Sequence, residues 1–542
     1  MLENYEEFTD EQRKIIEQFV TNTRSSVFVL RNLPEVIKGA LFSRYSRSRL
    51  GLRSLLLKDF INNDETSFDS IAGGSTDGIE GQLVAIQKAQ NFYDRILDGY
   101  GDDSIGELGG AHLALENISM IGAKVIEDAR IGGSPLEKST RYIYFDQKVN
   151  GEYLYYKEPV LMTSAFRDLY VNTCNMLFET YSDLIPKLTV VMERVFPKEE
   201  GVSNVAYTAA LRAKVLDCLR GLLPASAMTN MGVYGNGRFF ETLIGKLHGH
   251  PLTEMQEIGK AAYQELGKVI PSFIRRSDQN HRHYKAANDF KEKMTAEIQD
   301  VTTHFTSDLD RSEGPMVQLI RHDTDGPKRV ATAMLFENCD HSLLDIQKRI
   351  DEATPEELNR ILEAASSHRE NRRQKSPRAL EHATYTFEIV GDFGIYRDLQ
   401  RHRILTQERQ SLSCNFGYYV PSEIEGTDME KPYREAMDKA KEAYDLIADE
   451  LPEEAQYVVP MAYNIRWYFH VNLRALQWLC ELRSSPAGHV MYRLVAQELA
   501  RQVSEVHPEF ERFFKFVDYE GHDLGRLGQE IRKVEKQQRL KT

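Results

Sequence analysis

The sequence predicts a fold of mixed helices and strands, built from two similar halves in tandem. Strands are predicted at 317–321 and 385–390, where β-branched and aromatic residues form short apolar runs. Helices are predicted where apolar residues recur every three or four positions over long stretches. The 542 residues are enough for about two to four domains with substantial cores.

The tandem organisation is predicted by an internal repeat. Pro224 is followed at a spacing of 12 residues by Asn236 (236 − 224 = 12), and Pro460 is followed by Asn472 at the same spacing (472 − 460 = 12). In both places an arginine stands two residues after the asparagine. A repeat with this long period indicates duplication of a whole domain.

In the first half, Gly- and Asp-rich breaks at 72–78 and 99–107 separate segments with helical periodicity. Helices are expected at 1–60, 80–97, 160–200, 208–223 and 253–275. The charged and weakly apolar stretch 276–314 is expected to connect the halves. This places the two domains at 1–300 and 301–542.

In the second half, the strand at 317–321 is expected to end at a turn over 323–327. Helices are expected at 328–337, 355–367, 430–450, 463–480 and 487–505. The polar and basic tail from Arg532 is expected to be frayed.

Composition excludes several classes of protein. The net charge of −14 disfavours broad nucleic-acid binding, which needs a basic field. No apolar window is long enough to predict a membrane span, and the acidic N-terminus does not resemble a signal peptide. The five cysteines are scattered, so we expect reduced thiols in a cytoplasmic protein, without disulfides or a metal site.

The segment with the clearest chemistry is Arg401-His402-Arg403, followed after seven residues by Ser411. Guanidinium groups present forked donors that match phosphate, and a serine adds neutral donors. The segment therefore predicts an anion-binding site. Because adjacent basic residues also occur on ordinary solvated faces, the flanking sequence has to decide between the two.

Motifs on both sides of this segment occur in a recognisable order. They are Ser376-Pro377 and Glu381-His382 upstream, and Pro460, Asn472, Arg474 and Arg483 downstream. The ordered set resembles the signature of the flavin-dependent thymidylate synthases. The first half resembles the other end of the same signature, with Glu137, Ser139, Arg141 and Tyr142. The resemblance covers most of the chain and implies an α+β fold with two tandem synthase-like domains, each a mainly antiparallel sheet flanked by long helices.

The two copies resemble the family in complementary ways. Copy one keeps the end of the motif around Arg141 and has Arg220 before its proline, but it lacks the Arg-His-Arg triplet. Copy two keeps that triplet and the late Arg483, but has Gln456 in place of the arginine before the proline and Ser413 in place of the motif's last arginine. Because family sites lie between subunits, the resemblance implies one complete composite site and one defective reciprocal site.

The implied reaction is reductive methylation of dUMP to dTMP, with methylenetetrahydrofolate as carbon donor, FAD as hydride carrier and NADPH as reductant. The implied assembly is a homodimer whose domains form a pseudo-tetramer. The substrate is expected to bind Glu137, Ser139, Arg141, Arg220, Arg401 and Arg483, of which Arg141, Arg401 and Arg483 are expected to be catalytic. The FAD is expected to bind Arg401, His402, Arg403, Ile404, Ser411, Asn472, Arg474, Asn236 and Arg238.

Two departures leave other functions open. Asp398 stands where the family has a glutamine, and Asp102 stands where it has a histidine. One alternative is a flavin-dependent enzyme that modifies a pyrimidine nucleotide with another donor or product. The other is a nucleotide-binding protein without catalysis.

Some of these residues also have simpler structural explanations. Glu137 and Arg141 have the spacing of a helical ion pair, and Ser376 has the character of a helix cap. The aromatic residues Tyr385 and Phe387 are expected in the core rather than against a flavin.

Overall fold

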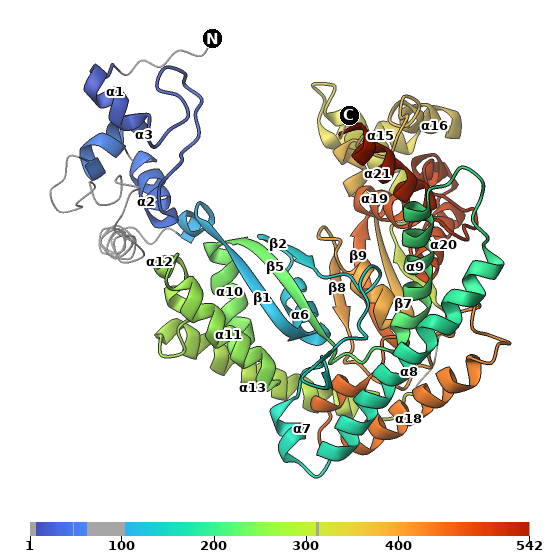
Figure 1. The fold of residues 1–542 in the computed structure, drawn as a ribbon. Coiled ribbons are helices and arrows are strands. Elements are labelled where there is room, and N and C mark those ends of the chain that lie inside the picture. The colour runs from blue at the N-terminus through green and yellow to red at the C-terminus, as the bar shows by residue number, and fades with distance from the viewer. Residues whose placement is uncertain (1–6, 47, 62–102, 311–313, 541–542) are drawn as a thin grey trace. The chain divides into compact units, whose positions relative to one another are not determined.

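The computed structural model describes residues 7–46, 48–61, 103–310 and 314–540 (Figure 1). The expected helix at 80–97, the break at 72–78 and Asp102 lie outside these residues. The described chain forms two compact units. The first unit takes its residues from Met1–Ile118, Val125–Glu137 and Thr229–Leu309, and the second from Ser119–Lys124, Lys138–Met228 and Asp310–Thr542.

The first unit contains a sheet with the strand order β1-β5-β2 (Figure 1). Strand β2 (Gly133–Glu137) runs antiparallel to β5 (Met228–Asn236), and β1 (Gly110–Ser119) is the other neighbour of β5. Helix α10 (Gly237–His248) begins where β5 ends, because the Asn236 side chain accepts a 2.8 Å hydrogen bond from the backbone N–H of Phe239. The strand therefore leads directly into a capped helix.

The remaining helices of this unit lie before the sheet or after α10. They are α1 (Asp10–Ile16), α2 (Glu35–Tyr45), α3 (Leu52–Leu55), η1 (Leu56–Ile61), η2 (Asp103–Glu107), α11 (Thr253–Leu266), α12 (Pro271–Ile274), η4 (Arg275–Ser277) and α13 (Arg282–Thr306). The helix α6 (Met120–Glu127) spans the boundary with the second unit. The stretch expected to connect the halves is mostly the helix α13, none of whose residues is buried.

The second unit contains a four-stranded antiparallel sheet with the order β6-β7-β9-β8. Strands β6 (Val317–His322) and β7 (Thr384–Asp392) confirm the two strands that the sequence predicts. The sheet is completed by β9 (Asn464–Asn472) and β8 (Thr406–Arg409). The expected core positions of Tyr385 and Phe387 are also confirmed, because both side chains are fully buried.

The prediction of one helix over 463–480 is wrong, because β9 occupies its first half and α19 (Leu473–Arg483) its second. The buried residues of β9 alternate with more exposed ones, which is the period of a strand. The prediction of a frayed tail is also wrong, because α21 (Leu527–Arg539) is helical and packs against α9 (Asn204–Leu219).

The other elements of the second unit are mainly helices, and most match the expected positions. They are β3 (Lys148–Val149), β4 (Glu152–Tyr153), α7 (Pro159–Thr163), α8 (Arg167–Val195), η3 (Arg220–Leu222), α14 (Gly326–Phe336), α15 (Leu343–Asp351), α16 (Pro355–Ala364), η5 (Arg378–His382), α17 (Phe393–Leu399), α18 (Glu430–Ala448), η6 (Glu454–Val458), α20 (Val490–Val506) and η7 (Pro508–Phe514). All five cysteines are free thiols in the structure.

The internal repeat is visible in the topology. The order β1-β5-β2 of copy one recurs as β7-β9-β8 in copy two. Asn472 caps α19 by accepting a hydrogen bond from the N–H of Ala475 at 2.9 Å, as Asn236 does for α10. The predicted tandem α+β organisation is therefore confirmed.

Within the second unit, the two copies meet at equivalent positions. Pro224 and Pro460 form an antiparallel bridge, and the N–H of Ala225 donates to the carbonyl of Val459 at 2.8 Å. The long helix α8 of copy one packs against α18 of copy two. Residues before Pro224 are thereby brought against copy two.

Candidate functional site

A cavity of about 810 Å³ opens in the second unit, beside the start of α19. Its lining contains eight arginine or lysine side chains and one carboxylate, that of Glu381. Its apolar lining includes Trp478, which is 42% exposed, and Ile404, which is 70% exposed. Exposed apolar side chains in a concave, basic surface are typical of a binding site for an anion with a flat apolar part.

Most of the residues expected to bind FAD line this larger cavity. They are Arg401, His402, Arg403, Ile404, Asn472 and Arg474, and the lining also includes Arg483. Ser411 is exposed and is not part of the lining among the described residues. Asn236 and Arg238 belong to the first unit, where Asn236 caps α10 and Arg238 forms an exposed 2.8 Å ion pair with Glu107.

The Asn-x-Arg repeat has the same local structure in both copies. The Arg474 guanidinium donates to Glu381 at 2.8 Å and to the carbonyl of Ser376 at 2.9 Å. Glu381 and Glu107 both lie in the short helical turn that precedes the first common strand of their copy. Each asparagine starts a helix, and each arginine fixes the turn before the sheet.

Arg483 donates from Nε to Nε2 of His402 at 3.0 Å. Burial lowers the pKa of His402 to about 3, and the positive charge of Arg483 acts in the same direction. His402 is therefore neutral at neutral pH and accepts this hydrogen bond, which orients the guanidinium of Arg483 at the cavity wall.

Four of the predicted arginines surround one carboxylate, Asp398. Arg220 donates to Asp398 at 3.2 Å. Burial alone would raise the pKa of Asp398, but Arg220, Arg141, Arg401 and Arg483 outweigh it and hold the pKa well below its ordinary value. The structure thus brings arginines of both copies into one electrostatic cluster.

Arg141 is buried and fully engaged with its own chain. It donates from Nε and Nη2 to the two carboxylate oxygens of Asp217, at 2.6 and 2.7 Å. It also donates to the Tyr492 hydroxyl at 2.9 Å. The Tyr492 ring lies 5.5 Å from the Arg141 guanidinium carbon and 5.6 Å from that of Arg483, so one ring contacts an arginine of each copy.

Arg141 lines a second, smaller cavity of about 310 Å³, together with Asp217 and His489. Arg401 and Arg483 line the larger cavity. Arg141 and Arg483 therefore share the Tyr492 ring and both lower the pKa of Asp398, but they line different cavities in the described part of the chain.

The remaining predicted substrate residues lie close to Arg141 in sequence. The Ser139 hydroxyl accepts a hydrogen bond from the N–H of Arg141 at 3.2 Å. Glu137 is buried at the end of β2, in the first unit. A helical Glu137–Arg141 ion pair is therefore ruled out, because Glu137 ends a strand and Arg141 pairs with Asp217. Ser376 is no cap either, since its buried hydroxyl has no hydrogen-bond partner among the described residues.

Sequence reasoning missed Asp217 and Tyr492. Asp217 lies on α9 three residues before Arg220, and Tyr492 lies on α20 three residues after His489. Neither belongs to a motif. Asp217 has the helical spacing of a neighbour of the predicted residue Arg220, whereas Tyr492 has no such relation to a predicted site residue.

The duplicated α+β fold and its basic cavity define a tandem protein whose two copies jointly supply the residues around one carboxylate. The chain belongs to the thymidylate synthase complementing protein family, whose model matches residues 62–272 and 318–509. It is 54% identical over 536 residues to a UPF0159 protein of Chlamydia muridarum, covering 98% of this chain and 100% of that relative. It is 34% identical to a UPF0159 protein of Thermoplasma acidophilum, covering 92% of this chain and 98% of that relative.

The chain also matches single-copy relatives over part of its length. The flavin-dependent thymidylate synthase of Sulfurisphaera tokodaii is 33% identical over 150 residues, which cover 26% of this chain and 56% of that protein.

The residues of the larger cavity fit a flavin nucleotide. Trp478 and Ile404 offer exposed apolar surface, and the basic lining suits a diphosphate. No helix in the described residues has both the length and the apolar character to cross a membrane. In the same residues, no group of three or more His, Cys, Asp or Glu side chains is arranged to hold a metal ion.

Proposed function

We propose that the chain is a flavin-dependent enzyme that converts dUMP to dTMP by reductive methylation, with methylenetetrahydrofolate as carbon donor and NADPH as reductant. The observation that carries the proposal is the cluster of Arg141, Arg220, Arg401 and Arg483 around Asp398, drawn from both copies and adjacent to the larger cavity. The partial match to flavin-dependent thymidylate synthases supports the same reaction class.

In this proposal, the arginines of copy one hold the nucleotide phosphate. Nη2 of Arg220 is buried and has no hydrogen-bond partner among the described residues, so it is available to a phosphate oxygen. Nη1 of Arg220 already donates a hydrogen bond to Asp398, and this contact orients the guanidinium group. For Arg141 to contribute, a phosphate has to compete with Asp217.

The arginines of copy two polarise the pyrimidine. A guanidinium hydrogen-bonded to a ring carbonyl stabilises the negative charge that develops when the ring accepts hydride. Arg483 is positioned for this by neutral His402, which accepts its Nε–H. Flavin, when bound in the larger cavity, supplies the hydride.

The test is release of tritium from dUMP labelled at carbon 5, with and without methylenetetrahydrofolate and NADPH. We expect purified protein to bind FAD, turn yellow and release tritium only when the folate is present. Release without folate would favour a pyrimidine-nucleotide enzyme with another donor. A colourless protein that binds dUMP would favour the binding protein without catalysis.

The composite nature of the site is tested by two matched variants. Arg141→Ala removes a predicted phosphate ligand and should weaken dUMP binding by about 100-fold or more. Ser413→Ala changes the corresponding position of copy two and should leave binding unchanged. Among the described residues, the Ser413 hydroxyl accepts one long hydrogen bond, from the N–H of Asn415 at 3.4 Å. Equal effects of the two variants would contradict the assignment.

The second candidate, an enzyme with another donor or product, is favoured by Asp217 and Asp398. Two carboxylates within the arginine cluster reduce the positive charge available to a phosphate. The tritium assay separates this candidate from thymidylate synthesis, because only its product or its donor requirement differs.

A further inference from the structure

The helix α13 carries a row of exposed apolar side chains, which we call the apolar stripe. The stripe consists of Phe290, Met294, Ile298, Val301 and Phe305, which recur at intervals of three or four residues. In a helix this spacing places all five side chains on one face. Their exposed fractions run from 40% to 73%, and the two phenylalanines are the most exposed. A contiguous row of large apolar side chains in contact with water indicates a surface that binds another molecule.

A different face of α13 attaches the helix to its own unit. The ring of Tyr284 contacts the ring of His248 edge-on, with 5.8 Å between the centroids. The Lys291 ammonium donates to the carbonyl of Gly249 at 3.0 Å. At about 100° per residue, Tyr284 and Lys291 lie roughly a quarter of a turn away from the apolar stripe. The attachment therefore leaves the stripe out of these contacts.

The charges of α13 and its C-terminal extension are divided between two halves. Residues 282–295 contain four Lys or Arg and two Asp or Glu (4 − 2 = +2), whereas residues 296–310 contain four Asp or Glu and no Lys or Arg (0 − 4 = −4). The helix dipole favours the reverse distribution, with acidic residues at the N-terminus and basic ones at the C-terminus. The stability of the lone helix therefore does not explain where these charges stand.

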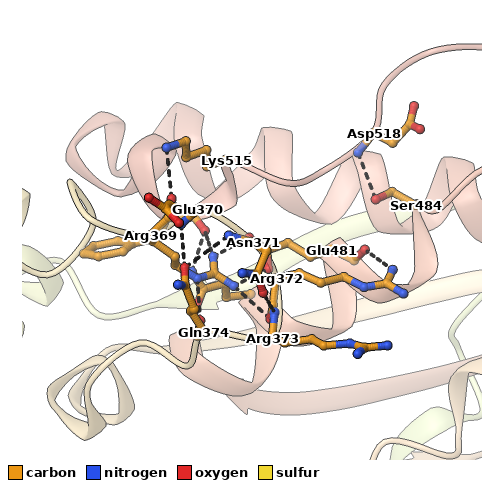
Figure 2. Close-up of polar contacts among 12 residues, drawn as sticks. Arg369, Glu370, Asn371, Arg372, Arg373, Gln374, Glu481, Ser484, Lys515 and Asp518 are labelled. Carbon is orange, nitrogen blue, oxygen red and sulfur yellow. Dashed lines mark hydrogen bonds and ion pairs between the residues drawn. The ribbon is translucent and has the colours of Figure 1, made fainter.

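Charges that the fold satisfies internally look different. In the loop 369–374 of the second unit, buried Arg369 pairs with both carboxylate oxygens of Glu481, and Lys515 donates to the carbonyl of Arg369 at 3.0 Å (Figure 2). On α13, Lys293 pairs with Asp289 at 2.8 Å, but both side chains are more than 60% exposed. Exposed pairs of this kind contribute little to stability, so these charges can face a partner at small cost.

We propose that α13 pairs with α13 of a second copy of this chain, antiparallel and stripe against stripe, about a two-fold axis beside Ile298. This register places Phe290 of each copy opposite Phe305 of the other, because both lie equally far from the axis (298 − 290 = 8 and 305 − 298 = 7). The basic half of each helix then lies along the acidic half of the other. A parallel pair would place like charges together, and its two helix dipoles would repel.

The pairing is independent of the proposed function. The family model matches residues 62–272 and 318–509, so α13 lies between the two matches. Among the described residues, α13 contributes nothing to the lining of the larger cavity. Loss of the pairing would therefore leave the proposed reaction intact, and failure of the tritium assay would leave the pairing intact.

The first test measures the mass of the full-length protein by sedimentation velocity at micromolar concentration. Ile298→Lys places two ammonium groups face to face at the axis, and we expect it to halve the mass of the assembly. The variant should keep its melting temperature, because no residue of α13 is buried. A monomeric unaltered protein would overturn the proposal, as would an Ile298→Lys protein of unchanged mass.

Ala296→Lys is the matched control. It adds the same charge two residues away, on the face of α13 that lies roughly opposite the stripe. The mass of the assembly should be unchanged in this variant. An equal loss of mass in both variants would show a general charge effect and overturn the proposal.

The second test measures the direction of the pair by disulfide cross-linking. It uses full-length protein with Cys339→Ser, because Cys339 is exposed and the other four native cysteines are buried. The double variant Phe290→Cys and Phe305→Cys should form covalent dimers under mild oxidation. Each single variant should form almost none, because its two cysteines would lie roughly 20 Å apart in the antiparallel pair, beyond the reach of about 7 Å between Cα atoms.

Each other outcome of the cross-linking contradicts the proposal. Covalent dimers of a single variant would show that the helices run parallel. A double variant that forms no covalent dimer would show that the two stripes do not meet. Because residues 290 and 305 are also roughly 20 Å apart along one helix, a disulfide within one chain cannot imitate the expected result.

Discussion

The side chain of Arg141 donates four hydrogen bonds to described residues, and two of them go to Asp217. A buried bidentate pair of this kind strongly resists separation, because removing one partner leaves an uncompensated charge. An incoming phosphate must therefore offer Arg141 more than Asp217 does. The carboxylate of Asp217 therefore competes with the anion for the guanidinium of Arg141 and weakens anion binding there.

Asp217→Asn should weaken this competition for Arg141. We expect dUMP to bind about tenfold more tightly to the variant, because the neutral amide holds the guanidinium less strongly than the carboxylate does. The apparent melting temperature should fall, since Arg141 then lacks its buried counter-charge. Calorimetry with dUMP and a thermal melt measure the two effects.

Asp445→Asn provides the control for this variant. Asp445 forms a surface ion pair with Lys441, so its neutralisation makes the same change in net charge and should alter neither property measurably. Weaker dUMP binding in Asp217→Asn would mean that Asp217 orients Arg141 for the ligand instead of competing with it.

His489 makes stability depend on pH. Its ring is buried, Nδ1 accepts from the N–H of Met491, and Nε2 donates to the carbonyl of Asp217. Burial lowers its pKa to about 3, and the charges of Arg220 and Arg141 act in the same direction. In the unfolded chain the pKa of the His489 ring is about 6.5, so below that pH the unfolded chain binds a proton at this ring and the folded chain does not. The stabilisation is complete above pH 6.5 and is lost as the pH falls towards 3.

Between pH 7 and pH 5, His489 should therefore lower the free energy of unfolding by about 2 kcal/mol. His489→Gln should show a smaller decrease in melting temperature over this interval than the unaltered protein. His304→Gln, at an exposed position on α13, should show the same decrease as the unaltered protein. Identical pH profiles for both variants would mean that His489 is protonated in the folded state.

The sequence predicts the arginines of the site but not the groups that hold them. Arg141, Arg220, Arg401 and Arg483 belong to motifs with fixed spacing, so a repeat analysis finds them. Asp217 and Tyr492 reach Arg141 because tertiary folding brings the C-terminal part of α9 and the N-terminal part of α20 to the same side chain. Such partners depend on tertiary packing, and no local pattern encodes them.

At the scale of elements, the strand β9 illustrates where periodicity fails. Trp467, Phe469 and Val471 are buried while Tyr468 and His470 are exposed, which is a strand pattern. The next eleven residues form the helix α19. A long sequence window averages the strand period of β9 with the helix period of α19, and it therefore predicts one helix. The local sign of the boundary is Asn472, which caps the N-terminus of α19.

The turn η3 contains Arg220 and Gly221, and at Gly221 it packs tightly against residues of copy two. A Cβ added at Gly221 would lie 2.6 Å from the Tyr433 hydroxyl and 2.9 Å from Cβ of Ala462. Glycine is therefore required by the approach of the two backbones, which are joined by a hydrogen bond from the N–H of Ala462 to the carbonyl of Gly221.

Gly221→Ala should destabilise the protein by about 1–3 kcal/mol, because the added methyl overpacks this contact. It should also weaken dUMP binding, since Arg220 is the adjacent residue. Gly245→Ala is the control, because a Cβ there meets no atom within 4 Å and lies inside a helix. That variant should be neutral or slightly stabilising. A stable Gly221→Ala protein would show that η3 can move away from copy two.

At the scale of the whole chain, the sequence predicts duplication but not how the copies share their helices. The repeat and the family match both run along the sequence, with one copy before the other. The second compact unit instead combines 138–228 of copy one with 310–542 of copy two. The domain boundary expected from the sequence, between residues 300 and 301, lies inside the helix α13. A sequence repeat shows which segments arose by duplication. A compact unit shows which segments bury their surfaces against one another in the fold.

This sharing predicts that copy two will not fold alone. A fragment of residues 310–542 lacks α8 and α9, which pack on α18 and α21, and it lacks the backbone hydrogen bond from Ala225 to Val459. Its apolar faces would be exposed to water, so the fragment should aggregate or melt without a cooperative transition. Size-exclusion chromatography and a thermal melt of the fragment measure this.

The matched comparison uses the same residues with the chain cut. A protease site inserted after Leu309 breaks the backbone where the second unit resumes, without removing any packing surface. The two pieces should stay together in native buffer, separate only in denaturant, and keep a cooperative melt. A free 310–542 fragment that melts cooperatively within a few degrees of the cut chain would show that copy two is self-sufficient. In that case α8 and α9 would cover a surface that is already stable, and the composite site would have to form between finished domains instead of within one fold.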